Sequence, residues 1–177
     1  MTVLGAVLAG GQSRRFGSDK AAASFRGQPL IAHTLAALSR QCDAVVVVGR
    51  DQPGQVSVPD WPRAGCGPLG GFAGAFRYAV ARGFDLVLTA GVDSVDLPDD
   101  LRARLTPAPA YVASQPVLGL WPVAGVGALQ EILLGSDSHS VRAFADRIGA
   151  RAVKLAAEPA NVNTLDDLTR LEQRHGL

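Results

Sequence analysis

Glycines followed by basic side chains near the N-terminus could bind phosphate. Gly10 and Gly11 come directly after an apolar run, and Arg15 and Lys20 follow shortly after them. Glycines leave backbone N–H groups open to a ligand that a Cβ would push away, and both cations can neutralise phosphate charge. The spacing matches neither a Walker A loop nor a dinucleotide-binding turn. The pattern therefore predicts a phosphate-binding loop of another kind; a plain strand-to-helix turn would leave the close run of glycine, arginine and lysine unexplained.

Asp93 is the best candidate for a metal ligand. It follows a strongly apolar run over residues 86–92 that leads into a polar turn. Mg²⁺ prefers carboxylate oxygens, takes one or two of them from the protein and bridges substrate phosphates. Two alternatives stay open at this point: Asp96 is a rival ligand, and Asp93 could merely cap a turn.

A second glycine-rich segment begins a predicted helix with the run Gly67-Pro68-Leu69-Gly70-Gly71. A proline near the first helical position loses no hydrogen bond, and the glycines keep the start of the helix uncovered, so that a ligand could approach it closely. A plain helix start with small residues for tight packing is the alternative interpretation.

Two asparagines, Asn161 and Asn163, lie two positions apart near the end of the chain. In an extended segment such residues point the same way, so both could face one cleft. Equally, Asn163 could belong only to the turn that begins the last helix.

The elements that must position these residues alternate along the chain. Short apolar runs predict strands over residues 3–8, 44–48, 56–58, 85–89, 117–121 and 151–155, and helical patterns cover residues 30–40, 69–82, 99–105, 127–134, 141–148 and 165–174. This alternation predicts an α/β protein of three layers, a mostly parallel twisted sheet with helices on both faces. Runs 45–48 and 86–88 are expected to be central strands, and residues 106–110 a surface loop. Because ligands of open α/β sheets bind outside the carboxyl ends of the strands, the polar groups that follow the strands should converge on one cleft.

Several segments together resemble one known family. Residues 8–20 resemble the L-A-G-G-x-S-x-R-M-G-x-D-K motif of nucleotidyltransferases, most closely that of the molybdenum cofactor guanylyltransferases, with Phe16 in place of Met. The run from Gly67 is similar to their G-P-L-A-G element, and an Asp stands at position 60 as in the family. Residues 161–164 are similar to N-V-N-T and residues 115–120 to H/Q-P-x-x-A-L. Around Asp93 only the Asp of the family's C-D-T-P-F pattern is shared.

The resemblance implies a Rossmann-like nucleotidyltransferase fold and an enzyme that joins GMP from GTP to molybdopterin bearing molybdenum and releases pyrophosphate. Arg15, Lys20 and Asp93 would be the catalytic residues, and Asp93 would hold Mg²⁺ as the cofactor. Nucleotide-binding residues would be Leu8, Ala9, Gly10, Gly11, Arg15, Lys20, Asp60, Gly67, Pro68, Leu69, Gly71 and Asp93, and acceptor-binding residues Gln115, Asn161 and Asn163. Proteins of molybdenum cofactor biosynthesis or molybdoenzymes would be transient partners. Two alternatives stay open: a related enzyme that uses CTP or a sugar phosphate, and a catalytically weak nucleotide-binding homologue.

Composition narrows the class of protein. The chain has 177 residues, 47% of them hydrophobic and 19% charged, with a net charge of +1. The near-zero charge argues against a general nucleic-acid binder. A chain of this length buries about 70% of its unfolded surface, so one domain over residues 1–177 is expected, with Cys42 and Cys66 as free thiols. The N-terminal apolar run is too short and too interrupted by glycine for a signal peptide. We therefore expect a cytoplasmic protein without membrane segments.

Overall fold

The largest sheet contains seven strands. The computed structural model of the protein describes residues 1–11 and 17–176. Its main strands are β1 (Val3–Leu8), β4 (Ala44–Val48), β5 (Val56–Val58), β6 (Leu86–Gly91), β8 (Ala110–Val112), β9 (Gln115–Pro122) and β10 (Arg151–Val153). They lie in the order β10-β8-β9-β6-β1-β4-β5. All neighbours are parallel except β9, which runs antiparallel to β6 and β8. The predicted mostly parallel sheet is confirmed.

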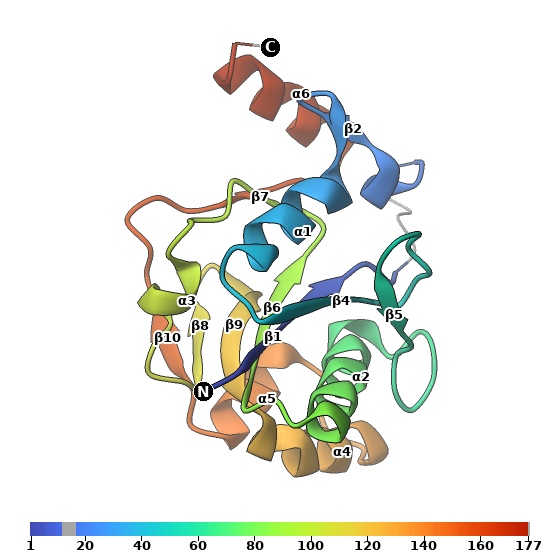
Figure 1. The fold of residues 1–177 in the computed structure, drawn as a ribbon, viewed down its shortest axis with the longest axis vertical. Coiled ribbons are helices and arrows are strands. Elements are labelled where there is room, and N and C mark those ends of the chain that lie inside the picture. Colours follow the sequence, from blue (N-terminus) through green and yellow to red (C-terminus); the bar gives the residue numbers. More distant parts are fainter. Residues whose placement is uncertain (12–16, 177) are drawn as a thin grey trace.

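Helices cover both faces of this sheet (Figure 1). The helices α2 (Gly67–Arg82), α4 (Val126–Leu134) and α5 (Val141–Arg147) pack on one face. The helices α1 (Leu30–Ser39) and α3 (Leu101–Arg104) pack on the other face. Side chains of β1 alternate between these layers, since Leu4 and Ala6 belong to the first core and Val3 and Val7 to the second. The three-layer arrangement expected from the sequence is therefore present.

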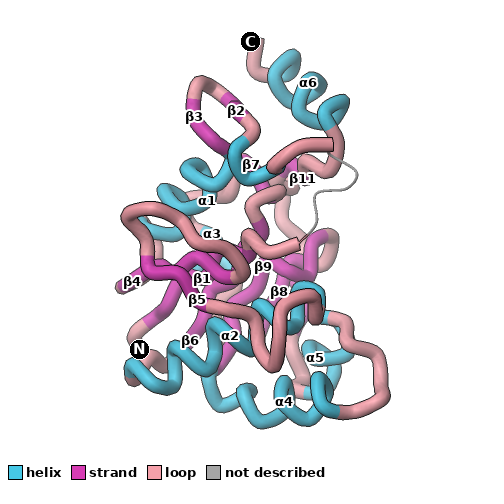
Figure 2. Tube along the Cα trace, turned by 90° about the vertical axis from the view of Figure 1, so that its right-hand side faces the viewer, coloured by secondary structure: helices cyan, strands magenta, loops and turns pink. Residues whose placement is uncertain are grey.

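A third, smaller core lies beyond the carboxyl edge of the sheet. It joins the hairpin of β2 (Ser24–Phe25) and β3 (Gln28–Pro29), the antiparallel pair of β7 (Ser94–Val95) and β11 (Ala160–Asn161), and α6 (Leu165–Arg174). Its buried members are Phe25, Leu30, Val95, Val162, Leu168 and Leu171. Figure 2 shows β7 and β11 on the same side of the molecule as α6. This core brings the last part of the chain back to the first.

The last helix begins as the sequence predicted. The Thr164 hydroxyl accepts from the N–H of Asp167, and the Asp167 carboxylate accepts from the N–H of Thr164. These two bonds form a capping box, which satisfies donors that the helix leaves unpaired. Hydrogen bonds from the backbone of Asn163 and from Thr164 lower the pKa of Asp167. The cap therefore fixes the segment just before α6, where Asn163 lies.

Some expectations need correction. The strand β6 is central, but β4 is second from the edge, because the short β5 pairs along its outer side. Residues 106–110 do not form only a loop, since Ala110 begins β8, which the sequence did not reveal. The helix expected over residues 99–105 covers only Leu101–Arg104. Cys42 and Cys66 are free thiols, as expected. Over residues 1–11 and 17–176, no helix has the length and apolar character needed to cross a bilayer.

Candidate nucleotide-binding site

An open pocket lies where β1, β4 and β6 reach their carboxyl ends. Its volume is about 470 Å³, which is within the range of small-molecule sites. It is lined by Leu8, Ala9, Gly10, Gly11, Asp19, Lys20, Ala21, Val48, Gly49, Arg50, Asp60, Gly65, Gly67, Pro68, Gly71, Gly91, Val92, Asp93 and Val117. Most of the residues predicted to bind nucleotide thus line one pocket, at the edge of the sheet where ligands of this fold class bind. Arg15 lies outside the described residues.

Two glycines form one wall of the pocket by close backbone contact. The N–H groups of Ala9 and Gly10 both donate to the carbonyl of Val48, at 2.9 and 3.1 Å. A Cβ on Gly49, whose φ is +85°, would lie 2.6 Å from the Cα of Gly10. Close packing against Gly49 therefore requires a glycine at position 10. The N–H of Gly10 is hydrogen-bonded to Val48, whereas the sequence suggested that it would bind phosphate. Gly11 has a φ of +123°, and among the described residues no atom lies within 4 Å of where its Cβ would be.

The start of α2 forms another wall of the pocket. The Oδ1 atom of Asp60 lies beside Gly49 and Gly71, where Cβ atoms would be 3.1 and 3.7 Å away. Burial raises the pKa of Asp60, and a hydrogen bond from the backbone of Gly65 partly offsets this. A Cβ on Gly74 would overlap the carbonyl oxygen of Pro59, so the helix lies directly against the loop that carries Asp60. Of the predicted run, Leu69 points into the core and is fully buried.

Lys20 and Asp93 come together in the pocket from opposite sides. The Nζ atom of Lys20 is 3.8 Å from Oδ2 of Asp93 and donates to Oδ1 of Asn163 at 3.4 Å. The backbone of Asp93 is fixed to the segment before α6, because its carbonyl accepts from the N–H of Val162 at 2.8 Å. Its carboxylate also lies against Gly91, where a Cβ would overlap Oδ1. Residues from the turn after β6, from the turn after Asp19 and from the segment before α6 therefore build one charged centre.

Asp19, Gly49 and Arg50 are candidate functional residues that the sequence alone did not indicate. Arg50 donates to both carboxylate oxygens of Asp19, at 2.8 and 3.0 Å, and both side chains line the pocket. Gly49 makes the close contact with Gly10. Asp19 stands in the x-D-K part of the glycine-rich motif, and Gly49 and Arg50 follow a predicted strand directly. The rule that ligands bind after strand ends could therefore have included all three.

Gln115, one of the predicted acceptor-binding residues, has both polar atoms of its side-chain amide in hydrogen bonds. It starts β9, whose antiparallel direction brings its first residues to the carboxyl edge of β6. Its Oε1 accepts from the Ser94 hydroxyl at 3.0 Å, and its Nε2 donates to the carbonyl of Pro159 at 2.6 Å. Asn161 is an exposed residue of β11 paired with Ser94, whereas Asn163 accepts a hydrogen bond from Lys20.

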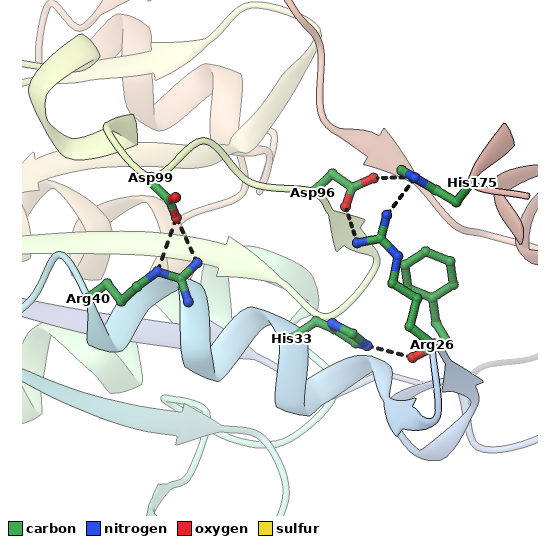
Figure 3. A network of polar contacts seen from close by, with 7 residues as sticks. Arg26, His33, Arg40, Asp96, Asp99 and His175 are labelled. Carbon is green, nitrogen blue, oxygen red and sulfur yellow. Dashed lines mark hydrogen bonds and ion pairs between the residues drawn. The ribbon is translucent and has the colours of Figure 1, made fainter. Parts of the chain in front are cut away.

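Asp96, the alternative metal ligand that the sequence offered, is not among the residues that line the pocket. Its φ is +57°. Figure 3 shows its carboxylate facing Arg26 and His175. Oδ1 is 3.5 Å from the Arg26 guanidinium, and Oδ2 is 2.7 Å from Nε2 of His175. Asp96 therefore ties the β2–β3 hairpin to the end of α6, outside the pocket lining.

The donor set fits a magnesium ion that is shared with a substrate. Within residues 1–11 and 17–176, no three His, Cys, Asp or Glu side chains gather into a complete metal site. Mg²⁺ does not need such a cage, because it binds through one or two carboxylates, waters and substrate phosphates. Asp93 supplies a partly exposed carboxylate, 33% accessible, beside Lys20. The Asp93 carboxylate therefore fits what Mg²⁺ takes from a protein at a phosphate site.

Comparison with known proteins identifies the family of this chain. Residues 5–150 match the model of the MobA-like NTP transferase domain. The molybdenum cofactor guanylyltransferase of Acidiphilium cryptum is 37% identical, over 94% of this chain and 92% of its own length. That of Rhodobacter capsulatus is 35% identical, over 98% of this chain and 97% of its own length. The chain belongs to the molybdenum cofactor guanylyltransferase family. It is accordingly a nucleotidyltransferase, as its N-terminal motif predicted.

Solved structures support the family fold. The molybdopterin-guanine dinucleotide biosynthesis protein A of Archaeoglobus fulgidus superposes with a TM-score of 0.77, at 20% identity and 98% coverage of each chain. CMP:2-keto-3-deoxy-manno-octonic acid synthetase, solved with CTP, superposes with a TM-score of 0.73 at 14% identity, over 99% of each chain. At these identities the likeness concerns the fold alone. The guanylyltransferase family therefore shares its Rossmann-like architecture with enzymes that use other nucleotides.

Proposed function

We propose that this protein transfers GMP from GTP to molybdopterin that carries molybdenum, and so forms the guanine dinucleotide cofactor and pyrophosphate. The observation that carries the substrate assignment is the similarity to guanylyltransferases over nearly their whole length. The pocket supports the chemistry, because it places Lys20 and Asp93 beside the glycine-rich turn at the carboxyl edge of the sheet.

The reaction would be an in-line displacement at the α-phosphorus of GTP. The terminal phosphate of molybdopterin forms the new P–O bond, and the bond between the α-phosphorus and the bridging oxygen of pyrophosphate breaks. The attacking phosphate already carries negative charge, so no side chain has to remove a proton. Catalysis would then consist of holding the two phosphates in line and neutralising charge.

Different residues of the chain would neutralise charge and bind the two substrates. Lys20, and Arg15 by its place in the motif, would neutralise charge on the α-phosphate and on the departing pyrophosphate. Asp60 and the start of α2 would bind the nucleoside. Asn163, which touches Lys20, would face the acceptor. Asp93 is the carboxylate that would hold Mg²⁺, and the bound ion would add charge neutralisation at the phosphates.

Calorimetric titration with GTP, CTP, ATP and UTP, each with and without Mg²⁺, tests the nucleotide half of the proposal. We expect selective GTP binding that Mg²⁺ strengthens. A preference for CTP would contradict the guanylyl assignment. Binding to no nucleotide would contradict the assignment of the pocket as a nucleotide-binding site. Pyrophosphate release with GTP and molybdopterin then tests turnover, and binding without release would identify a catalytically weak homologue.

A further inference from the structure

An ion pair links the two loops on one side of the pocket. The Arg50 guanidinium donates from two nitrogens to the two oxygens of Asp19, a bidentate geometry that fixes direction as well as distance. Arg50 directly follows Gly49, whose backbone packs on Gly10. It therefore projects from the segment directly after β4, whereas Asp19 directly precedes the turn over residues 20–22.

Asp19 also organises the turn that carries Lys20. The turn η1 (Lys20–Ala22) begins at the lysine, and Oδ1 of Asp19 accepts from the N–H of Ala21 at 3.2 Å. The carbonyl of Asp19 accepts from the N–H of Ala22, also at 3.2 Å. The hydrogen bonds from Arg50 lower the pKa of Asp19, so the carboxylate stays charged and keeps both partners.

Lys20 is thus held at both ends. Its Nζ atom faces Asp93 and Asn163, and its backbone starts the turn that Asp19 caps. We propose that Arg50 is a positioning residue, which acts through Asp19 to fix the turn that places Lys20 beside Asp93. The consequence for turnover rests on the proposed function, whereas the effect on the turn does not.

The energetic scale fits positioning better than stabilisation. The side chains of Arg50 and Asp19 are 30% and 51% exposed, and ion pairs this exposed to solvent contribute little to stability. A displacement of a catalytic group by about 1 Å, in contrast, can lower turnover about a hundredfold. Loss of Arg50 should therefore leave the fold stable and disturb the geometry of one turn.

Amide hydrogen exchange in the nucleotide-free protein tests the structural step. In Arg50→Ala, we expect the N–H groups of Ala21 and Ala22 to exchange at least about tenfold faster, because opening of the turn costs less free energy. Arg40→Ala is the matched control, since Arg40 donates from two nitrogens to Asp99 on the surface, away from the pocket (Figure 3). Exchange within twofold of wild type in Arg50→Ala would overturn the inference.

Turnover in a double-mutant cycle tests whether Arg50 acts through the turn. We expect Arg50→Ala to lower kcat about tenfold with little change in KM for GTP, and to have little further effect in the Lys20→Ala background. Arg50→Lys should recover only part of the loss, because an ammonium group cannot make the bidentate contact. Equal losses in both backgrounds, or a change confined to KM, would mean that Arg50 contacts phosphate directly and would refute the positioning role. If wild type turned over no GTP, the proposed function would fail, and the exchange rates would still decide whether Arg50 orders the turn.

Discussion

The carboxylate of Asp93 lies directly against the backbone of Gly91, and a Cβ at Gly91 would overlap its Oδ1 atom. The glycine therefore determines where the carboxylate can lie. Gly91→Ala should displace Asp93, reduce stability by about 1–3 kcal/mol through overpacking and lower kcat about tenfold or more. Chemical denaturation and pyrophosphate release measure the two effects. Gly127→Ala, in the exposed start of α4 with open space around it, is the matched control. Equal activity of Gly91→Ala and wild type would show that Asp93 is free to move.

Lys20 is the cation that faces Asp93. Lys20→Ala should lower kcat about a hundredfold or more, because one preorganised charge contributes about 3 kcal/mol to transition-state stabilisation. The exposed Lys154 provides the control Lys154→Ala, which removes the same charge away from the pocket. Steady-state assays of pyrophosphate release compare the two variants. Turnover of Lys20→Ala within threefold of wild type would contradict the catalytic role.

The two carboxylates near the end of β6 should differ in their effect on magnesium. Asp93→Asn should weaken Mg²⁺-dependent GTP binding about tenfold or more, because a charged ligand is lost. Asp96→Asn should leave binding within threefold, since Asp96 faces Arg26 and His175, and Asn tolerates its positive φ. Calorimetry with and without Mg²⁺ decides between them. The reverse order of effects would restore Asp96 as the ligand.

Asp60 should make stability depend on pH. Burial raises its pKa, so the folded protein keeps this proton at pH values where the unfolded chain has released it. The free energy of unfolding therefore falls as pH rises from the pKa of Asp60 in the unfolded chain to its higher pKa in the folded protein. Below the pKa of the unfolded chain, Asp60 is protonated in both states and no longer makes stability depend on pH. Asp60→Asn should raise Tm at pH 7 and lose this advantage in acid, while GTP affinity falls about tenfold.

Thermal unfolding at several pH values measures the Asp60 effect, with the exposed Asp51→Asn as control. A gain in Tm for Asp60→Asn that stayed constant into acid would show that ionisation of this carboxyl is not its cause.

Gly49 should be more sensitive to substitution than other glycines of positive φ. Gly49→Ala combines a left-handed backbone, which costs about 1 kcal/mol for other residues, with a clash against Gly10 that adds about 1–3 kcal/mol. Gly54 has a φ of +76° but nothing within 4 Å of a Cβ, so Gly54→Ala isolates the backbone cost. Chemical denaturation gives both values. Equal losses would mean that the Gly10 loop moves aside freely.

The sequence predicted six of the seven strands of the large sheet and the six α-helices of the described residues, because each carries a hydrophobic period or a recognisable start. It did not predict the two-residue pairs β2–β3 and β7–β11, which are too short to show alternation. It also missed β8, which follows a proline-rich stretch. The pairs β2–β3 and β7–β11 matter, because they form the third core together with α6, and Val162 in this core directly precedes Asn163, which accepts from Lys20.

For the site, the rule about strand ends brought together Lys20, Asp60 and Asp93, which line one pocket. What it could not give is how loops contact one another. The ion pair of Arg50 with Asp19 and the backbone contact of Gly49 with Gly10 join segments that no local pattern connects. The use of the Gly10 N–H by Val48 likewise depends on the register of two strands.

The contact of Lys20 with Asn163 spans 143 residues of sequence. During synthesis, the ribosome releases the glycine-rich turn and most strands of the sheet long before this asparagine. A nascent chain that has not reached residue 163 can bury much of its two large cores, yet it has no partner for Lys20 from this segment. Assembly of the charged centre therefore waits until Asn163 has been synthesised, although the last residue of the pocket lining, Val117, is made well before it.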